Sequence, residues 1–144
     1  MNNPSEPTKS TPTVLHLNPA DMHSNPAYTQ AVVVSGPTKT IYIGMQNAVD
    51  AAGSVVGPGD LARQTEQTLQ NVEMCLAAAG AGLEHLIQMT IYIAQGQQIQ
   101  AGFEVFQRWW GDRPNPPTNN GMMVAGLMPP VYLIGISAIA VAPE

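Results

Sequence analysis

Two stretches near the C-terminal end of the chain carry apolar residues at both odd and even positions. They are Gly121–Leu127 and Val131–Val141, and the turn Met128-Pro129-Pro130 separates them. Side chains on a β-strand alternate between the two faces of its sheet. A strand that is apolar at both sets of positions therefore needs cover on both faces. Helices can cover one face, and we expect a second copy of the chain to cover the other.

Earlier segments rich in β-branched residues predict four further strands. The first is a short candidate edge strand, and the turn Gly36-Pro37-Thr38-Lys39 predicts that the second and third form a hairpin. The four segments are Thr13–Leu17, Tyr28–Ser35, Thr40–Met45 and Leu86–Ile93.

Two segments show helical periodicity. Asp60–Ala79 has an apolar stripe, an N-cap candidate in Asp60 and a stop signal in Gly80. Gln98–Trp110 carries Phe103, among other apolar residues, along one side. Without the candidate edge strand Thr13–Leu17, the resulting order β-β-α-β-α-β-β predicts an α+β fold with both helices on one face of the sheet.

The length of 144 residues indicates one domain, which we place at residues 12–144. Residues 1–11 are polar and contain two prolines, and we expect a disordered tail there.

Charged residues are few and mostly acidic. They make up 10% of the chain, against about 25% in ordinary soluble domains. Five Lys or Arg face ten Asp or Glu, a net charge of −5, which argues against nucleic acid as a partner. Such sparse charge leaves little to cover a monomer's surface and again favours self-association.

The chain lacks the patterns of membrane and secreted proteins. No apolar run reaches the roughly 18 residues of a membrane span, and the polar N-terminus is unlike a signal peptide. The single Cys75 excludes an intrachain disulfide framework and fits a reducing compartment. We therefore expect a cytoplasmic protein without a membrane partner.

No motif indicates a metal or a cofactor, and we expect neither. His16, His23 and His85 are dispersed, with no metal-ligand spacing, and we interpret them as surface or loop residues. The glycine-rich loop before Asp60 lacks the lysine and the glycine spacing of nucleotide-binding motifs. Cys75 is expected to be packed and inert.

Three separated segments resemble the Rid (YjgF) family: Ile41–Asp60, Gln64–Ile93, and the C-terminal pair VAGLMP and ISAIAV. The resemblance covers roughly residues 25–143. It implies a chorismate-mutase-like fold and a homotrimer, in which three sheets line a central barrel-like core and ligand clefts lie between adjacent subunits. It also implies an activity, because active members hydrolyse reactive enamines and imines such as 2-aminoacrylate to keto acids and ammonia.

The sequence departs from that family at the residues that carry the chemistry. The Arg that grips the substrate carboxylate in active members corresponds to Asn120, and the Cys two residues later corresponds to Met122. The Glu that orders the hydrolytic water corresponds to Gly135. An Arg–carboxylate contact contributes roughly 1.5–3 kcal/mol, and Asn120 has no charge with which to make one.

The other matched positions divide between changed and retained residues. The Ser-Gly-Gln motif of the family reads Gly44-Met45-Gln46, so only Gln46 is kept, and an Asn on the second helix corresponds to Phe103. The Tyr of the early loop is retained as Tyr28. Gln46 is a candidate either to bind a ligand or to hold the following loop in place.

These changes predict an altered, largely apolar small-molecule cleft. Its candidate catalytic residues are Asn120 and Tyr28, and its candidate ligand-binding residues are Met45, Gln46, Phe103, Met122 and Gly135. Carbonyl or enamine chemistry without the family's Arg–Glu pair is the leading hypothesis. The alternatives are the usual 2-imino acid deaminase, with Arg108 or Arg113 as the cation, and a trimer that binds without catalysis. Ribonuclease activity, attributed to some relatives, is disfavoured by the acidic balance.

Overall fold

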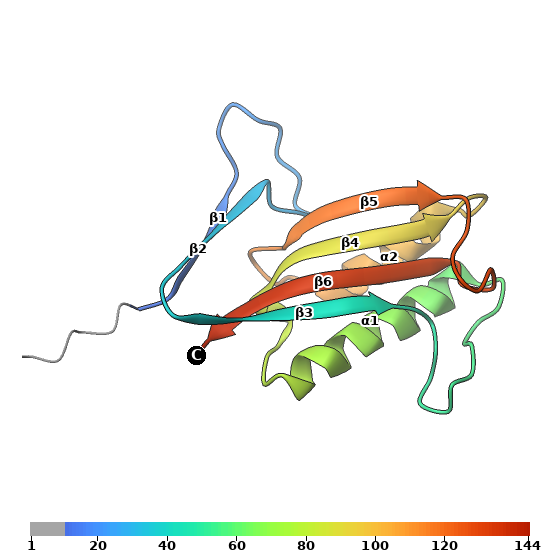
Figure 1. The fold of residues 1–144 in the computed structure, drawn as a ribbon. Helices are drawn as coiled ribbons and strands as arrows, with labels where there is room; N and C mark the ends of the chain where they lie inside the picture. Colours follow the sequence, from blue (N-terminus) through green and yellow to red (C-terminus); the bar gives the residue numbers. More distant parts are fainter. Residues whose placement is uncertain (1–10) are drawn as a thin grey trace, which may run out of the picture.

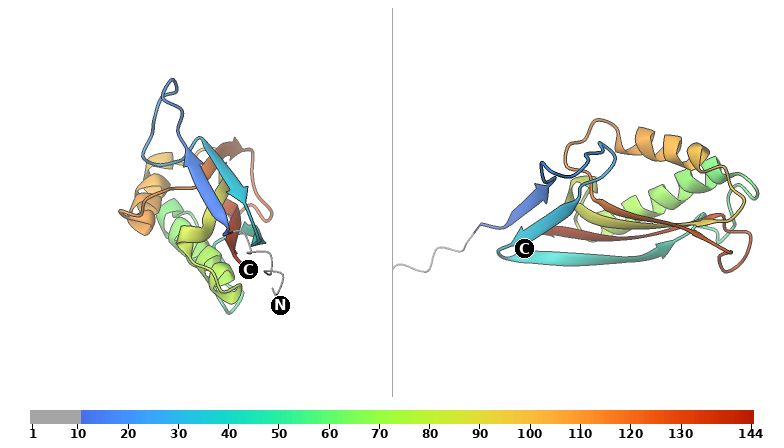
Figure 2. Two further views of the ribbon diagram at one scale, coloured as in Figure 1. Left: turned by 90° about the vertical axis from the view of Figure 1, so that its left-hand side faces the viewer. Right: turned by 90° about the horizontal axis from the view of Figure 1, so that it is seen from above.

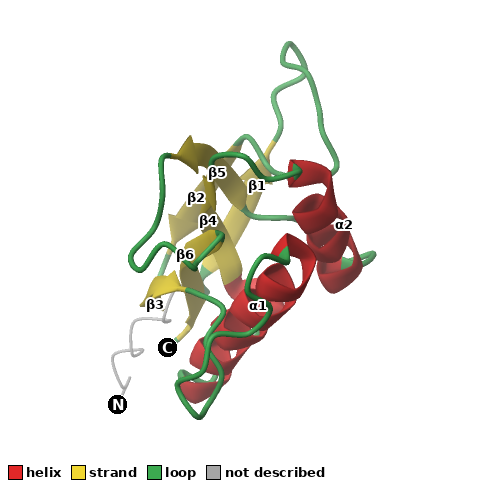
Figure 3. Ribbon diagram, turned by 90° about the vertical axis from the view of Figure 1, so that its right-hand side faces the viewer, coloured by secondary structure: helices red, strands yellow, loops and turns green. Residues whose placement is uncertain are grey.

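The computed structural model describes residues 11–144, so most of the tail expected over residues 1–11 lies outside the described residues. Four strands form the main sheet, in the spatial order β3-β6-β4-β5, and two helices cover one of its faces (Figures 1 and 3). The strands are β3 (Thr38–Gln46), β4 (Leu86–Ala94), β5 (Thr118–Val124) and β6 (Ile134–Pro143), and the helices are α1 (Leu61–Ala78) and α2 (Ile99–Trp110). The expected α+β class, with both helices on one face, is confirmed.

Two further strands, β1 (Thr13–Leu17) and β2 (Ala31–Ser35), form a separate antiparallel ribbon. The ribbon extends beyond one end of the main sheet (Figure 2). A short 3-10 turn, η1 (Leu83–His85), leads into β4.

One expected strand pairing is wrong. The segment after the Gly36 turn does not fold back on β2, because β2 pairs with β1 while β3 pairs antiparallel with β6. Strands β5 and β6 follow one another in the chain but are not neighbours in the sheet, because β4 lies between them, antiparallel to β6 and parallel to β5. The residues of a turn predict only that the chain changes direction there. The strand that each segment pairs with depends on contacts with distant parts of the chain, which a turn motif does not encode.

Helix α1 begins and ends within one residue of the expected bounds, because its caps are local. The Asp60 carboxylate accepts a hydrogen bond from the Arg63 backbone N–H at 3.1 Å. At the other end Gly80 adopts a φ of +71°, and the Gly80 and Ala81 N–H groups bond the Ala77 and Leu76 carbonyls. Neither α1 nor α2 has the length and apolar character needed to span a bilayer.

The hydrophobic core lies between the helices and the main sheet. On β6 the helix-facing side chains are those of Ile134, Ile136, Ala138 and Ala140, all of them buried. The face of the sheet that points away from the helices, here called the open face, carries Gly135, Ser137 and Ile139 from the same strand. On this face Tyr42 of β3 is 78% exposed, so within the described chain the open face is uncovered.

Candidate functional site

Four of the candidate residues lie on the open face, near the N-terminal end of β6. Gly135 pairs with Tyr92, and Tyr92 pairs with Met122 on the parallel neighbour β5. Paired residues share a face, so Met122 and Gly135 lie on the same side of the sheet. Asn120 belongs to the next row on that face, where it pairs with Thr90.

Met45 lies directly over Gly135. A Cβ built on Gly135 would be 2.6 Å from the Met45 Sδ atom and 2.9 Å from its Cγ atom. The Met45 side chain therefore occupies the space above the open face into which any side chain at position 135 would project. Met45 and Gly135 both depart from the family pattern, and although 90 positions separate them in the chain, they are in contact in the fold.

A hollow of about 230 Å³ lies beside this contact, toward the middle of the open face. Gly44, Thr90 and Ser137 line it, and Tyr42 borders it. None of its lining residues is charged, so the open face presents a weakly polar depression next to the Met45–Gly135 contact. Gln46 sits at the end of β3, where its Nε2 donates to the Gly44 carbonyl at 3.0 Å, which ties its amide to its own strand.

Phe103 lies on the other face of the sheet. It lines a cavity of about 160 Å³ between α2 and the main sheet, here called the α2 cavity. Isoleucines from β4 and β6, together with Phe106 and Gly121, supply most of the remaining lining, and none of the lining residues is charged. The hydroxyl of Thr65, the one polar side chain among them, donates to the Leu61 carbonyl at 2.7 Å.

The α2 cavity is accessible because two residues leave it uncovered. Phe103 is 39% exposed although it belongs to the apolar side of α2. A Cβ on Gly121 would meet nothing within 4 Å, so β5 leaves open space there. Phe103 also lines a neighbouring groove of about 210 Å³, which the segment Asn25-Pro26-Ala27 borders on its far side.

Asn119, rather than Asn120, faces the helix side of β5 and reaches this neighbourhood. Its Nδ2 donates to the Ala27 carbonyl at 3.3 Å, and its Oδ1 is buried without a hydrogen-bond partner in the described chain. An unsatisfied buried acceptor costs roughly 1–3 kcal/mol. The Asn119 oxygen is therefore a candidate acceptor for a ligand N–H or O–H group.

Tyr28 follows Ala27 in the loop that packs against the start of β5. Its hydroxyl is 2.9 Å from His23 Nε2. The loop is held in place by the Thr29 N–H, which donates to the Pro117 carbonyl at 3.2 Å. Tyr28 is thus placed near Asn119 and the Phe103 groove, and away from Gly135.

Within one chain, then, the candidate residues fall into two groups. Asn120, Met122, Met45 and Gly135 lie on the open face. Phe103 lies on the helix side, as does Gln46, which pairs with the helix-facing Ile136, and Tyr28 lies in the loop that contacts Asn119. The sequence favoured Asn120 over its neighbour Asn119 and gave no role to Gly121, whereas Asn119 and Gly121 are the residues on the helix side of β5. Because alternate residues of a strand face opposite sides of the sheet, the sequence could have indicated that Asn119 and Gly121 share one face and Asn120 and Met122 the other.

The two arginines considered as substitute cations are engaged elsewhere on the chain. Arg108 lies on the outer side of α2, 3.8 Å from Glu66, and Arg113 donates to the carbonyls of Trp109 and Trp110. Neither lines the α2 cavity or the open-face hollow. Among residues 11–144, no three His, Cys, Asp or Glu side chains gather closely enough to hold a metal ion.

Comparison with known proteins agrees with this architecture. The family model described as endoribonuclease L-PSP matches residues 19–142. A 2-iminobutanoate/2-iminopropanoate deaminase of Rattus norvegicus is 31% identical over 115 residues, which is 80% of each chain.

Solved structures show the same likeness. The protein YyfB of Yersinia pestis, described as a Rid family protein of unknown function, superposes with a TM-score of 0.77 at 28% identity, covering 90% of this chain and 98% of that one. The YjgF gene product of E. coli gives a TM-score of 0.63 at 27% identity, covering 71% and 80%. Because the family model spans most of the chain and a relative is 31% identical over 80% of it, this chain belongs to the endoribonuclease L-PSP family, also called the YjgF/Rid family.

Proposed function

We propose that the protein is a homotrimer that binds a small, largely apolar carbonyl, imine or enamine compound at the α2 cavity. The ligand is held by hydrocarbon contacts and by hydrogen bonds from uncharged groups. The observation that carries the proposal is the lining of this cavity, which contains no charged side chain and opens beside Gly121. An apolar pocket with a few polar groups at its rim is the usual form of a small-molecule site.

The exposed surface supports self-association. The open face carries Tyr42, Met45 and Met122 uncovered, and β5 has one unpaired edge. Contiguous exposed apolar side chains of this kind mark an interaction surface. A second copy packed on the open face would bury them and would bring a neighbouring chain to the free edge of β5, close to the α2 cavity.

Asn119 and Tyr28 supply polar groups near the proposed site, although neither lines the α2 cavity itself. The unpartnered Asn119 oxygen can accept a hydrogen bond from an imine or enamine N–H, and the Tyr28 hydroxyl can donate or accept one. Asn120 and Met122, on the open face, reach the same ligand only from a neighbouring chain. Met45 and Gly135 shape the adjoining surface.

The first experiment tests binding at the α2 cavity. The Gly121→Val variant places a side chain in open space, so it fills the cavity without a clash. Gly126→Val is its matched control, because a Cβ at Gly126 also meets nothing within 4 Å and Gly126 does not line the cavity. Thermal shift with a panel of aliphatic and aromatic carbonyl compounds should show stabilisation of the parent and of Gly126→Val, and none of Gly121→Val. Equal stabilisation of all three would contradict the proposed site.

A second candidate function is the deaminase activity for which relatives such as the rat protein are named. It is favoured by the family membership and opposed by the absence of a cation in the α2 cavity. Freshly generated 2-iminobutanoate, coupled to detection of the released ammonia, separates the two. Hydrolysis that is faster than in buffer, and that is lost in Gly121→Val but kept in Gly126→Val, would establish the deaminase.

The oligomeric state and turnover are tested independently. Sedimentation equilibrium should return three times the mass of the single chain, and a stable monomer would refute the trimer. A ligand that binds at the α2 cavity and is recovered unchanged would assign the protein to the non-catalytic alternative.

A further inference from the structure

A second cavity, of about 400 Å³, lies between β1, the C-terminal end of β6 and the loop that follows α2. Here it is called the β1 cavity. Its apolar wall includes Val14, Ile87 and Val141, and its polar lining includes His16, Glu84, His85 and Arg113. It shares no lining residue with the α2 cavity, so whatever it holds is separate from the proposed function.

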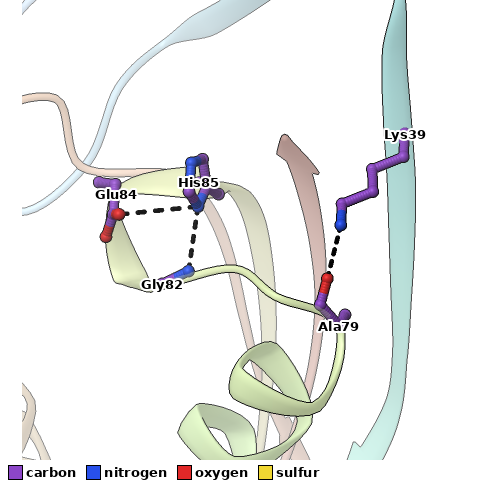
Figure 4. Close-up of polar contacts among 5 residues, drawn as sticks. All are labelled: Lys39, Ala79, Gly82, Glu84 and His85. Carbon is purple, nitrogen blue, oxygen red and sulfur yellow. Dashed lines mark hydrogen bonds and ion pairs between the residues drawn. The ribbon is translucent and has the colours of Figure 1, made fainter. Parts of the chain in front are cut away.

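The hydrogen bonding of His85 leaves one ring nitrogen as a free donor. Its Nδ1 accepts from the Gly82 N–H at 3.0 Å (Figure 4). A nitrogen that accepts a hydrogen bond carries no proton, so the neutral ring has its proton on Nε2. The Glu84 carboxylate lies 3.7 Å from the same Nδ1, but that contact requires a proton there and gives way to the shorter hydrogen bond.

Arg113 places a positively charged guanidinium, fixed by hydrogen bonds, in the lining of the same cavity. Its Nη1 donates to the carbonyls of Trp109 and Trp110 at 3.3 and 2.8 Å, which anchors the guanidinium on the end of α2. The Trp110 indole N–H in turn donates to the Arg113 carbonyl at 2.8 Å. Within residues 11–144, no hydrogen bond uses the Nε or Nη2 of Arg113, and no carboxylate forms an ion pair with it. A guanidinium already fixed in place binds a planar carboxylate at little entropic cost.

His16 completes the polar lining from β1. Its Nε2 is buried without a partner in the described chain, and desolvation lowers the pKa of His16 below 6.5. At neutral pH the ring is therefore uncharged and contributes a flat, weakly polar wall. Glu84 is the opposing charge, but its side chain is largely exposed and lies at the mouth of the cavity.

We propose that the β1 cavity binds a short aliphatic carboxylate. The carboxylate group lies between the Arg113 guanidinium and the Nε2–H of His85, and the alkyl chain packs against Val14, Ile87 and Val141. The anchored cation, the free donor and the hydrocarbon wall each match one part of such a molecule. The Glu84 charge at the mouth weakens binding by repulsion.

The test uses butyrate as the probe and the histidine ring protons as reporters. In NMR titrations of the intact protein, the ring Hε1 signals of His16 and His85 should shift saturably. That of His23, which lies in the loop with Tyr28, should stay in place. Butyramide, which has the same shape without the charge, should cause no shift. Glu84→Gln should tighten butyrate binding.

Two substitutions on the β1–β2 ribbon localise the site. Val14→Phe fills the cavity from a partly exposed position and should weaken binding by about tenfold or more, a change of about 1.4 kcal/mol per factor of ten. Val33→Phe is the matched control, because Val33 is similarly exposed on the partner strand and does not line the cavity. Thermal melts of both establish that they are folded.

Several results would overturn the proposal: no saturable shift of His16 or His85 at tens of millimolar butyrate, equal binding of butyramide, or equal weakening by Val14→Phe and Val33→Phe. Tighter binding of 2-aminobutyrate than of butyrate, with loss of affinity in Glu84→Gln, would replace the carboxylate by an amino acid and refute the stated ligand class. None of these outcomes bears on the α2 cavity.

Discussion

The contact between Met45 and Gly135 makes a quantitative prediction about coupled substitutions. In Gly135→Ala the new methyl would lie 2.6 Å from the Met45 Sδ and 3.1 Å from the Asn47 Nδ2. Overpacking of this kind costs roughly 1–3 kcal/mol. Met45 is 46% exposed and can rotate into solvent, whereas the Asn47 amide is held by its hydrogen bond to the Ile134 carbonyl at 3.1 Å. We therefore expect a destabilisation near the lower limit, about 1 kcal/mol.

A double-mutant cycle isolates the part due to Met45. In the Met45→Ala background the main obstacle is gone, and Gly135→Ala should be neutral or slightly stabilising, because alanine loses less backbone entropy than glycine on folding. The coupling energy should be about 1 kcal/mol. Urea unfolding followed by circular dichroism gives the four free energies. All four proteins must be compared at one protein concentration, since the stability of an oligomer depends on it.

Additive free energies, within about 0.3–0.5 kcal/mol, would refute this reasoning. They would mean that Met45 does not hold the space above Gly135, and that the two departures from the family pattern are unrelated. A measured coupling would instead show that a larger residue at position 135 requires a smaller one at position 45. Restoring an acid by Gly135→Glu should then require removal of the Met45 side chain as well.

Three further predictions concern stability and pH. Gln64→Ala should destabilise the fold by about 2–4 kcal/mol in urea unfolding, because the buried amide bonds the backbone of Gly57, Val131 and Leu133; exposed Gln70→Ala should cost almost nothing. Gly80→Ala should cost about 1 kcal/mol by the same measurement, since φ is +71° there. Burial lowers the folded-state pKa of His16 below 6.5, so the unfolded chain binds more protons and stability falls as the pH drops through that value. His16→Asn should reduce this loss of stability in urea midpoints taken above and below pH 6.5, and His23→Asn should leave it unchanged.

The sequence predicted the helices and strands themselves better than it predicted which strands pair with one another. The bounds of α1 were nearly correct because Asp60 and Gly80 act through bonds to residues three or four positions away. Strand β5 lies three residues earlier than expected at both ends, while β6 begins three residues later and ends two residues later than expected. Polar Thr118 lies in β5 because the parallel ladder with β4 begins there, while apolar Val131 lies in the preceding loop. Hydrophobicity alone does not distinguish an apolar loop from a strand.

The sequence could predict that the site involves β5, but not which face of that strand the site residues occupy. Matching to the family pattern selected Asn120 and Met122, and a shift of one residue moves every side chain to the other side of a strand. The structure instead places Gly121 in the lining of the α2 cavity, and Asn119 on the same face of β5, where it bonds the Ala27 carbonyl. The convergence of His16 and His85 on one cavity was equally invisible, since 69 positions separate them in the chain and only the packing of β1 against the end of β6 joins them.

Because the candidate residues lie on two faces of the sheet, they can act on one ligand only at a place where both faces are within reach. Next to Phe103 and Met122 the two faces meet at the free edge of β5, which carries Gly121 on its helix side and Met122 on its open side. Only a chain packed along that edge can contact both faces at once. If the protein is a trimer, Asn120 and Met122 of one copy can reach the α2 cavity of another, and all the candidates can belong to one kind of site. In a monomer the open-face residues would be excluded from the site, and only Phe103, Asn119 and Tyr28 would remain to bind the ligand.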